Sequence, residues 1–101
     1  MDSKILLGKI LQRFKDLGFT QVEGYSTFGY IRETNNSVFV TREQGAVTCI
    51  PFDKILIGID AYKSKPTLYT EGPSVLRKFG ITHISSPVFS MLHLLKQEDF
   101  H

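Results

Sequence analysis

Apolar residues recur at steps of three and four along residues 4–17. This spacing puts them on one side of a helix, so the segment predicts an amphipathic helix with Lys and Arg on its polar side. The apolar stripe consists of Leu7, Ile10, Leu11, Phe14 and Leu17. Gly18 suits the left-handed residue that commonly ends a helix. We expect the first four residues of the stripe to lie in the core.

Three runs of β-branched and aromatic residues follow, at residues 25–33, 37–42 and 46–50. Such runs are typical of strands. Asn35-Asn36 separates the first two runs, and Gln44-Gly45 separates the last two. Both pairs tolerate the positive φ of a tight hairpin turn. The segment therefore predicts a three-stranded antiparallel meander.

Helical spacing returns after Pro51, and residues 52–63 predict a second long helix that packs on the meander. Its residues Ile55, Leu56 and Ile59 are expected in the core. Shorter helical segments are predicted at residues 73–79 and 87–96, with Pro73 and Pro87 at their first positions. Ser86 is the expected N-cap of the last helix. Residues 97–101 are expected to fray.

These elements fit one domain, because 101 residues is close to the commonest domain size. We expect a single α+β domain over residues 1–101. It comprises an N-terminal helix, a three-stranded antiparallel meander, a packed helix and a C-terminal helical pair at about residues 73–96.

Charge and cysteine content narrow the class of protein. The chain has 12 Lys and Arg against 10 Asp and Glu, a net charge of +2, which excludes a strongly basic histone-like protein and an acidic nucleic-acid mimic. No apolar run is long enough to cross a bilayer, and residues 1–15 lack a signal-peptide pattern. We therefore expect a cytoplasmic protein without a membrane partner. Cys49 is the only cysteine and is predicted to be a small buried residue.

The charges are distributed unevenly along the chain. Residues 73–97 contain no Asp or Glu, but they contain Arg77, Lys78 and Lys96 as well as two histidines. A local positive field favours an anionic partner. The alternative is that these side chains only solvate the surface.

The run Leu76-Arg-Lys-Phe-Gly-Ile-Thr-His-Ile resembles the helix-turn-helix of small prokaryotic and phage DNA-binding proteins. In those proteins a helix ends in Leu-Gly-Ile/Val-Ser/Thr before the recognition helix. Gly80 supplies the positive φ that a sharp turn between helices needs. The second helix lacks the Arg, Gln or Asn that usually read bases. The resemblance therefore implies DNA binding with few base contacts from that helix.

The charge and the resemblance together predict a small non-enzymatic DNA-binding or regulatory protein. Ser85 and Ser86 would stand at the start of the second helix, where free N–H groups and hydroxyls can meet a phosphate or a base edge. The expected contact residues are Arg77, Lys78, His83, Ser85, Ser86 and Lys96. A net charge of +2 cannot give tight binding alone, so we expect a homodimer, formed through a sheet edge or the C-terminal helix.

Other interpretations remain open at this stage. The leading rival is a protein-interaction module, such as an inhibitor or a subunit of a larger complex, docked by the helical pair or a sheet edge. Strand aromatics with Arg32 and Arg42 are either core residues or a platform that stacks single-stranded nucleic acid. Phosphate-loop and nucleophile-elbow motifs are missing, and the His and Cys residues are scattered. We therefore expect no catalysis, cofactor or metal site.

Overall fold

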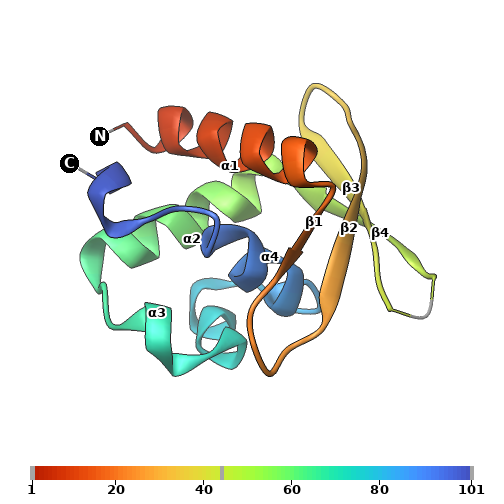
Figure 1. Cartoon of the computed structure of the whole chain (residues 1–101). Helices are drawn as coiled ribbons and strands as arrows, with labels where there is room; N and C mark the ends of the chain where they lie inside the picture. Colours follow the sequence, from red (N-terminus) through yellow and green to blue (C-terminus); the bar gives the residue numbers. More distant parts are fainter. Residues whose placement is uncertain (1, 44, 101) are drawn as a thin grey trace.

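Helix α1 (Ser3–Leu17) lies along one side of a β-sheet in the computed structural model (Figure 1). The structure describes residues 2–43 and 45–100. The sheet comprises β1 (Phe19–Gln21), β2 (Thr27–Glu33), β3 (Ser37–Thr41) and β4 (Val47–Pro51). The chain then forms α2 (Phe52–Ser64), α3 (Leu68–Glu71), the 3₁₀ helix η1 (Pro73–Phe79), α4 (Ser85–Leu92) and the 3₁₀ helix η2 (Gln97–Phe100). The expected α+β class is confirmed.

Helix α1 begins and ends at capping residues. The Asp2 side chain accepts a hydrogen bond from the Lys4 N–H at 2.7 Å, and Gly18 ends the helix with φ of 81°. Its buried face is Leu6, Leu7, Ile10 and Phe14. The predicted stripe was therefore partly wrong. Leu11 is half-buried and Leu17 is 57% exposed, because the buried face is turned toward Leu6.

The sheet has four antiparallel strands in the order β1-β2-β3-β4, not the three that the sequence predicted. The extra strand is β1, in which Thr20 pairs with Phe28 of β2. The predicted strand at residues 25–33 begins at Thr27 instead of Tyr25. The hairpin at Asn35-Asn36 is confirmed, since the Thr34 N–H bonds the Ser37 carbonyl at 2.8 Å, but neither Asn adopts the positive φ that the sequence led us to expect. Of the second turn, Gly45 has the expected positive φ of 81°, while Gln44 lies outside the described residues.

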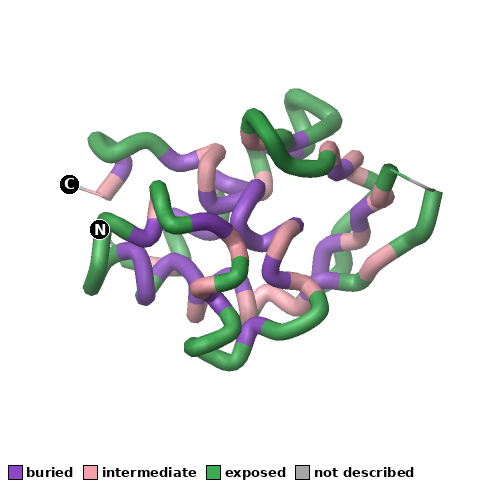
Figure 2. Tube along the Cα trace, turned by 90° about the horizontal axis from the view of Figure 1, so that it is seen from below, coloured by how far each residue is buried: buried purple, intermediate pink, exposed green. Residues whose placement is uncertain are grey.

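The helices cover one face of the sheet and leave the other uncovered (Figure 1). Buried residues gather between the helices and the sheet, whereas exposed residues follow the outer turns (Figure 2). The predicted core residues Ile55 and Ile59 are fully buried there, whereas Leu56 is only partly buried. Cys49 belongs to the uncovered face and is exposed, so its predicted burial was wrong.

The C-terminal third differs most from the expected boundaries. Residues 73–79 form a 3₁₀ helix, and α4 begins at Ser85 and ends at Leu92 instead of covering residues 87–96. Pro87 is therefore the third helical residue, where its missing N–H is still tolerated. The expected fraying after residue 96 is contradicted as far as Phe100, because Asp99 is buried and ion-paired with Arg13 of α1.

Candidate functional site

A depression of about 570 Å³ lies where the turn between η1 and α4 meets the end of β3. Two parts of the chain that are distant in sequence, residue 42 and residues 77–86, contribute its lining. The lining residues are Arg42, Arg77, Thr82, His83, Ser85 and Ser86. Four of the six predicted contact residues are thus brought together.

The turn itself is built by Gly80. This residue has φ of 83°, and its N–H bonds the Arg77 carbonyl at 3.1 Å. The next N–H, of Ile81, bonds the Leu76 carbonyl at 3.2 Å. The two bonds form a Schellman motif, which a left-handed glycine commonly completes. Ile81 is fully buried, so the turn is anchored in the core while Arg77 stays exposed at its rim.

His83, an exposed residue of the turn, carries backbone strain. Its φ of 59° lies in the left-handed region, and it is the only non-glycine residue with positive φ among residues 2–43 and 45–100. The His83 carbonyl accepts a hydrogen bond from the Arg42 guanidinium at 2.9 Å. Strained residues of this kind persist where surrounding contacts hold them, and they cluster at functional sites.

Arg42 fixes the sheet to this turn. Besides the bond to His83, its Nε donates to the Thr48 hydroxyl at 3.0 Å. A guanidinium has five N–H donors, so three remain for another acceptor. Lys54 of α2 adds a third positive charge nearby, since its Nζ lies 3.3 Å from the Gly80 carbonyl. Among the described carboxylates, none forms an ion pair with Arg42, Lys54 or Arg77.

The N-terminal end of α4 supplies uncapped polar groups. Ile84 occupies the N-cap position and offers no side-chain hydrogen bond, so the prediction that Ser86 caps the helix was wrong. Ser85 is the first helical residue, is only 7% exposed and lines the depression. Its hydroxyl has no hydrogen-bond partner among the residues that the structure describes. Unpaired N–H groups at a helix start, beside cations, suit an anion.

Two predicted contact residues do not belong to this depression. Lys78 is exposed on η1 without lining it. Lys96 lies beyond the other end of α4, where its backbone N–H bonds the Asp99 carboxylate at 2.6 Å. Conversely, the sequence did not mark Arg42 or Lys54 as neighbours of this turn, because only tertiary packing brings them there.

The burial of α4 limits how a partner can meet it. Nearly all of its residues are buried: Ser85, Pro87, Val88, Phe89, Ser90, Met91 and Leu92. A recognition helix needs a long exposed face that enters the major groove. Here only the N-terminal end of α4 is accessible to a partner.

The expected aromatic platform is divided between different surroundings. Phe28 is buried, and Tyr30 packs edge-on against Phe14 at 5.3 Å between ring centroids. Tyr25 packs instead on Phe89 of α4. Only Phe39, with the Arg32 guanidinium 4.1 Å above its ring, lies on the uncovered face of the sheet. The core interpretation therefore fits these rings better than a continuous stacking surface.

Within the described part of the chain, no helix is long and apolar enough to span a membrane. No group of three or more His, Cys, Asp or Glu among those same residues is placed to hold a metal ion. Comparisons with protein-family models, curated proteins and solved structures found no match.

Proposed function

We propose that the protein is a non-enzymatic nucleic-acid-binding protein, with duplex DNA as its target. A backbone phosphate would sit in the depression between Arg42, Arg77 and the start of α4. One observation carries the proposal: two arginines without carboxylate partners line the same depression as an uncapped helix start, where the Ser85 hydroxyl has no partner among the described residues. Phosphate oxygens accept several hydrogen bonds at once and match such a set of donors.

The same geometry defines the mode of binding. Because α4 is buried along its length, its side chains are not available to read base edges in a groove. Phosphate contacts position a protein on DNA but carry no sequence information. We therefore expect binding that is steeply salt-dependent and weakly selective between sequences. Two copies of the site in a homodimer would double the number of contacts.

The test measures fluorescence anisotropy of a labelled random duplex in a series of salt concentrations. Arg77→Ala should weaken binding and reduce the slope of log K against log salt by about 1, the value for one lost phosphate contact. Lys96→Ala is the matched control, because it removes the same charge at the opposite end of α4 and should leave the slope unchanged. Equal losses in the two variants, or no binding at low salt, would contradict the proposal.

A second candidate function is protein association through the uncovered face of the sheet. Phe19, Gly29, Thr41 and Val47 form one row of paired residues, so their side chains share a face. Phe19 is 49% and Val47 63% exposed on that face. Association through this surface predicts little salt dependence and a loss on Phe19→Ser, neither of which the phosphate site predicts.

A further inference from the structure

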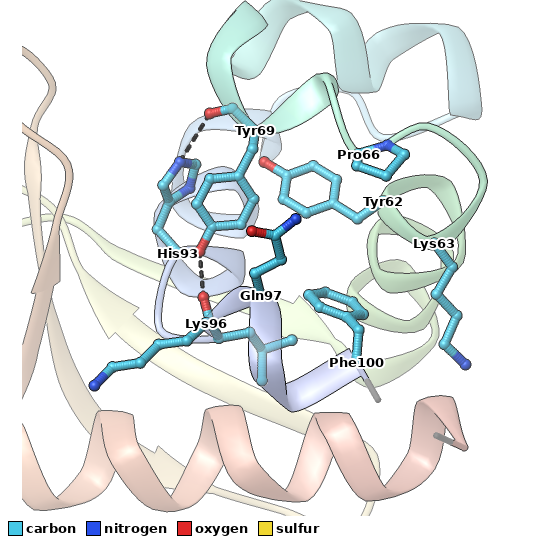
Figure 3. A pocket seen from close by; sticks show the side chains of 9 residues that line it. Tyr62, Lys63, Pro66, Tyr69, His93, Lys96, Gln97 and Phe100 are labelled. Carbon is cyan, nitrogen blue, oxygen red and sulfur yellow. Dashed lines mark hydrogen bonds between the residues drawn. The ribbon is translucent and has the colours of Figure 1, made fainter.

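A second cavity, of about 800 Å³, lies at the other end of α4 from the basic depression. Helices α2, α3 and η2 and the residues that follow α4 enclose it (Figure 3). Rings form most of its wall. The main lining residues are Tyr62, Pro66, Tyr69, His93, Gln97 and Phe100. A volume of this size is typical of small-molecule sites, which are mostly apolar with a few polar groups.

Hydrogen bonds hold the ring cluster in place. The Tyr69 hydroxyl donates to the Leu95 carbonyl. The two ring nitrogens of His93 lie 2.9 Å from the Phe89 carbonyl oxygen and 3.0 Å from the Tyr69 carbonyl oxygen. The Tyr69 and His93 rings are stacked at a tilt, with 3.9 Å between centroids. The wall is thus formed before any ligand enters, which lowers the entropy cost of binding.

One residue of the cavity wall carries a buried polar group that the protein does not satisfy. Tyr62 is 2% exposed, and its hydroxyl has no hydrogen-bond partner among the described residues. Burial raises the pKa of Tyr62 well above its ordinary value, so the hydroxyl keeps its proton and remains a donor. A buried donor without an acceptor is costly, and such groups are rare in folded proteins.

The cavity wall carries little charge toward its interior. Lys63 and Lys96 border the cavity, but their ammonium groups point away from the ring cluster (Figure 3). The nearby Asp99 carboxylate is bound by Arg13 and the Lys96 N–H. The wall therefore offers flat ring surfaces, the unpaired Tyr62 hydroxyl and the Gln97 amide, while the lysine charges point away from the rings.

We propose that this cavity binds a small neutral molecule with a flat aromatic ring and a hydrogen-bond acceptor, which accepts a hydrogen bond from the Tyr62 hydroxyl. The ring packs among Tyr69, Phe100 and the other aromatic walls, as aromatic pairs do in protein cores. The acceptor satisfies the only buried phenol left unpaired among the residues the structure describes. This site is independent of the proposed nucleic-acid contact.

The test compares two bicyclic probes of the same shape, quinoline and naphthalene, by ¹H–¹⁵N NMR titration of the whole protein at neutral pH. Quinoline carries a ring nitrogen that accepts a hydrogen bond, and naphthalene does not. Quinoline should shift the resonances of residues around Tyr62 and His93, and it should bind about tenfold more tightly than naphthalene. In Tyr62→Phe the two probes should bind within about twofold of each other.

Gln97→Trp tests the location, because Gln97 is exposed and lines the cavity, so a larger side chain there fills the space. Both probes should then lose binding. Equal affinity of the two probes for the natural protein, no shifts at either ligand's solubility limit, or binding unchanged by Gln97→Trp would overturn the proposal. If Tyr62→Phe does not fold, nuclear Overhauser effects from quinoline to the Tyr69 and His93 rings decide, and their absence overturns it.

Discussion

The Asp99 carboxylate joins the C-terminal segment to α1, and its removal gives a sharp test of the fold. Arg13 donates two hydrogen bonds to it, at 2.7 and 2.9 Å. The Lys96 N–H donates a third at 2.6 Å, and Lys9 lies 3.4 Å away. Arg13 also bonds the Leu94 carbonyl at 2.8 Å. We expect Asp99→Asn to loosen the segment from Leu94 to Phe100.

The loss of stability on Asp99→Asn depends on how far the two paired side chains are exposed to water. Hydrogen bonds to charged groups each contribute about 1.5–3 kcal/mol, but their energies overlap when they share one acceptor. The Asp99 side chain is 8% exposed and that of Arg13 is 37%, so water recovers part of the loss at Arg13. We expect Asp99→Asn to lower the free energy of unfolding by about 2–3 kcal/mol and Tm by roughly 10–20 °C.

The loss should depend on pH. Hydrogen bonds from Arg13, followed by that from the Lys96 N–H, hold the pKa of Asp99 well below its ordinary value of 3.8. A lowered folded-state pKa means that the stabilisation is present above pH 3.8 and is lost as the pH falls below it. The stability difference between the natural protein and Asp99→Asn should therefore shrink below about pH 4, by at most about 1.4 kcal/mol per pH unit.

Urea denaturation followed by circular dichroism at several pH values measures this difference. Glu23→Gln is the matched control, because it removes an exposed carboxyl with no bonded partner among the described residues. Its stability should stay within about 0.5 kcal/mol of the natural protein at every pH. A stability loss of only about 0.5 kcal/mol for Asp99→Asn near neutral pH would refute the reasoning. So would a stability difference that does not shrink below about pH 4.

Two further predictions concern the core and assembly. Phe14 is fully buried and Leu56 is only partly buried, so in urea denaturation Phe14→Ala should cost about 3–5 kcal/mol and Leu56→Ala about 1–2; equal costs would contradict the assigned faces. The open edge of β4 should pair two copies, giving a dimeric mass by light scattering that Val47→Lys reduces to a monomer. A monomeric natural protein at high concentration would exclude the dimer.

The long elements of the fold were predictable because each carries its own periodic pattern. Helices α1 and α2 and the β2–β3 hairpin lie close to their expected positions. Strand β1 was missed because three residues are too few for an alternating pattern. It is held instead by β2 and by the Thr20 hydroxyl, which donates to the Ser90 carbonyl at 2.9 Å. That contact spans 70 residues of sequence, so no local pattern reports it.

The candidate site was also predictable only where its residues are close together in the sequence. Gly80 and the polar residues after it were recognisable, because a turn between helices has a local signature. The contribution of Arg42 to the depression was not recognisable, because its hydrogen bond to His83 spans 41 residues of sequence. The burial of α4 has only a partial signal in the sequence. Val88, Phe89, Met91 and Leu92 lie on one side of the helix, whereas Ser85 and Ser90 are buried as well although they are polar.

The position of each cation, and not the net charge of +2, decides what the depression can bind. Helix α4 has eight residues, so about 12 Å of helix separates its two ends at 1.5 Å per residue. That length exceeds the Debye length of about 8 Å at physiological salt. Lys96, beyond the far end of α4, is therefore screened from an anion in the depression, whereas Arg42 and Arg77 line it. This is why Arg77→Ala and Lys96→Ala, equal in charge, separate a built phosphate site from a diffuse basic surface.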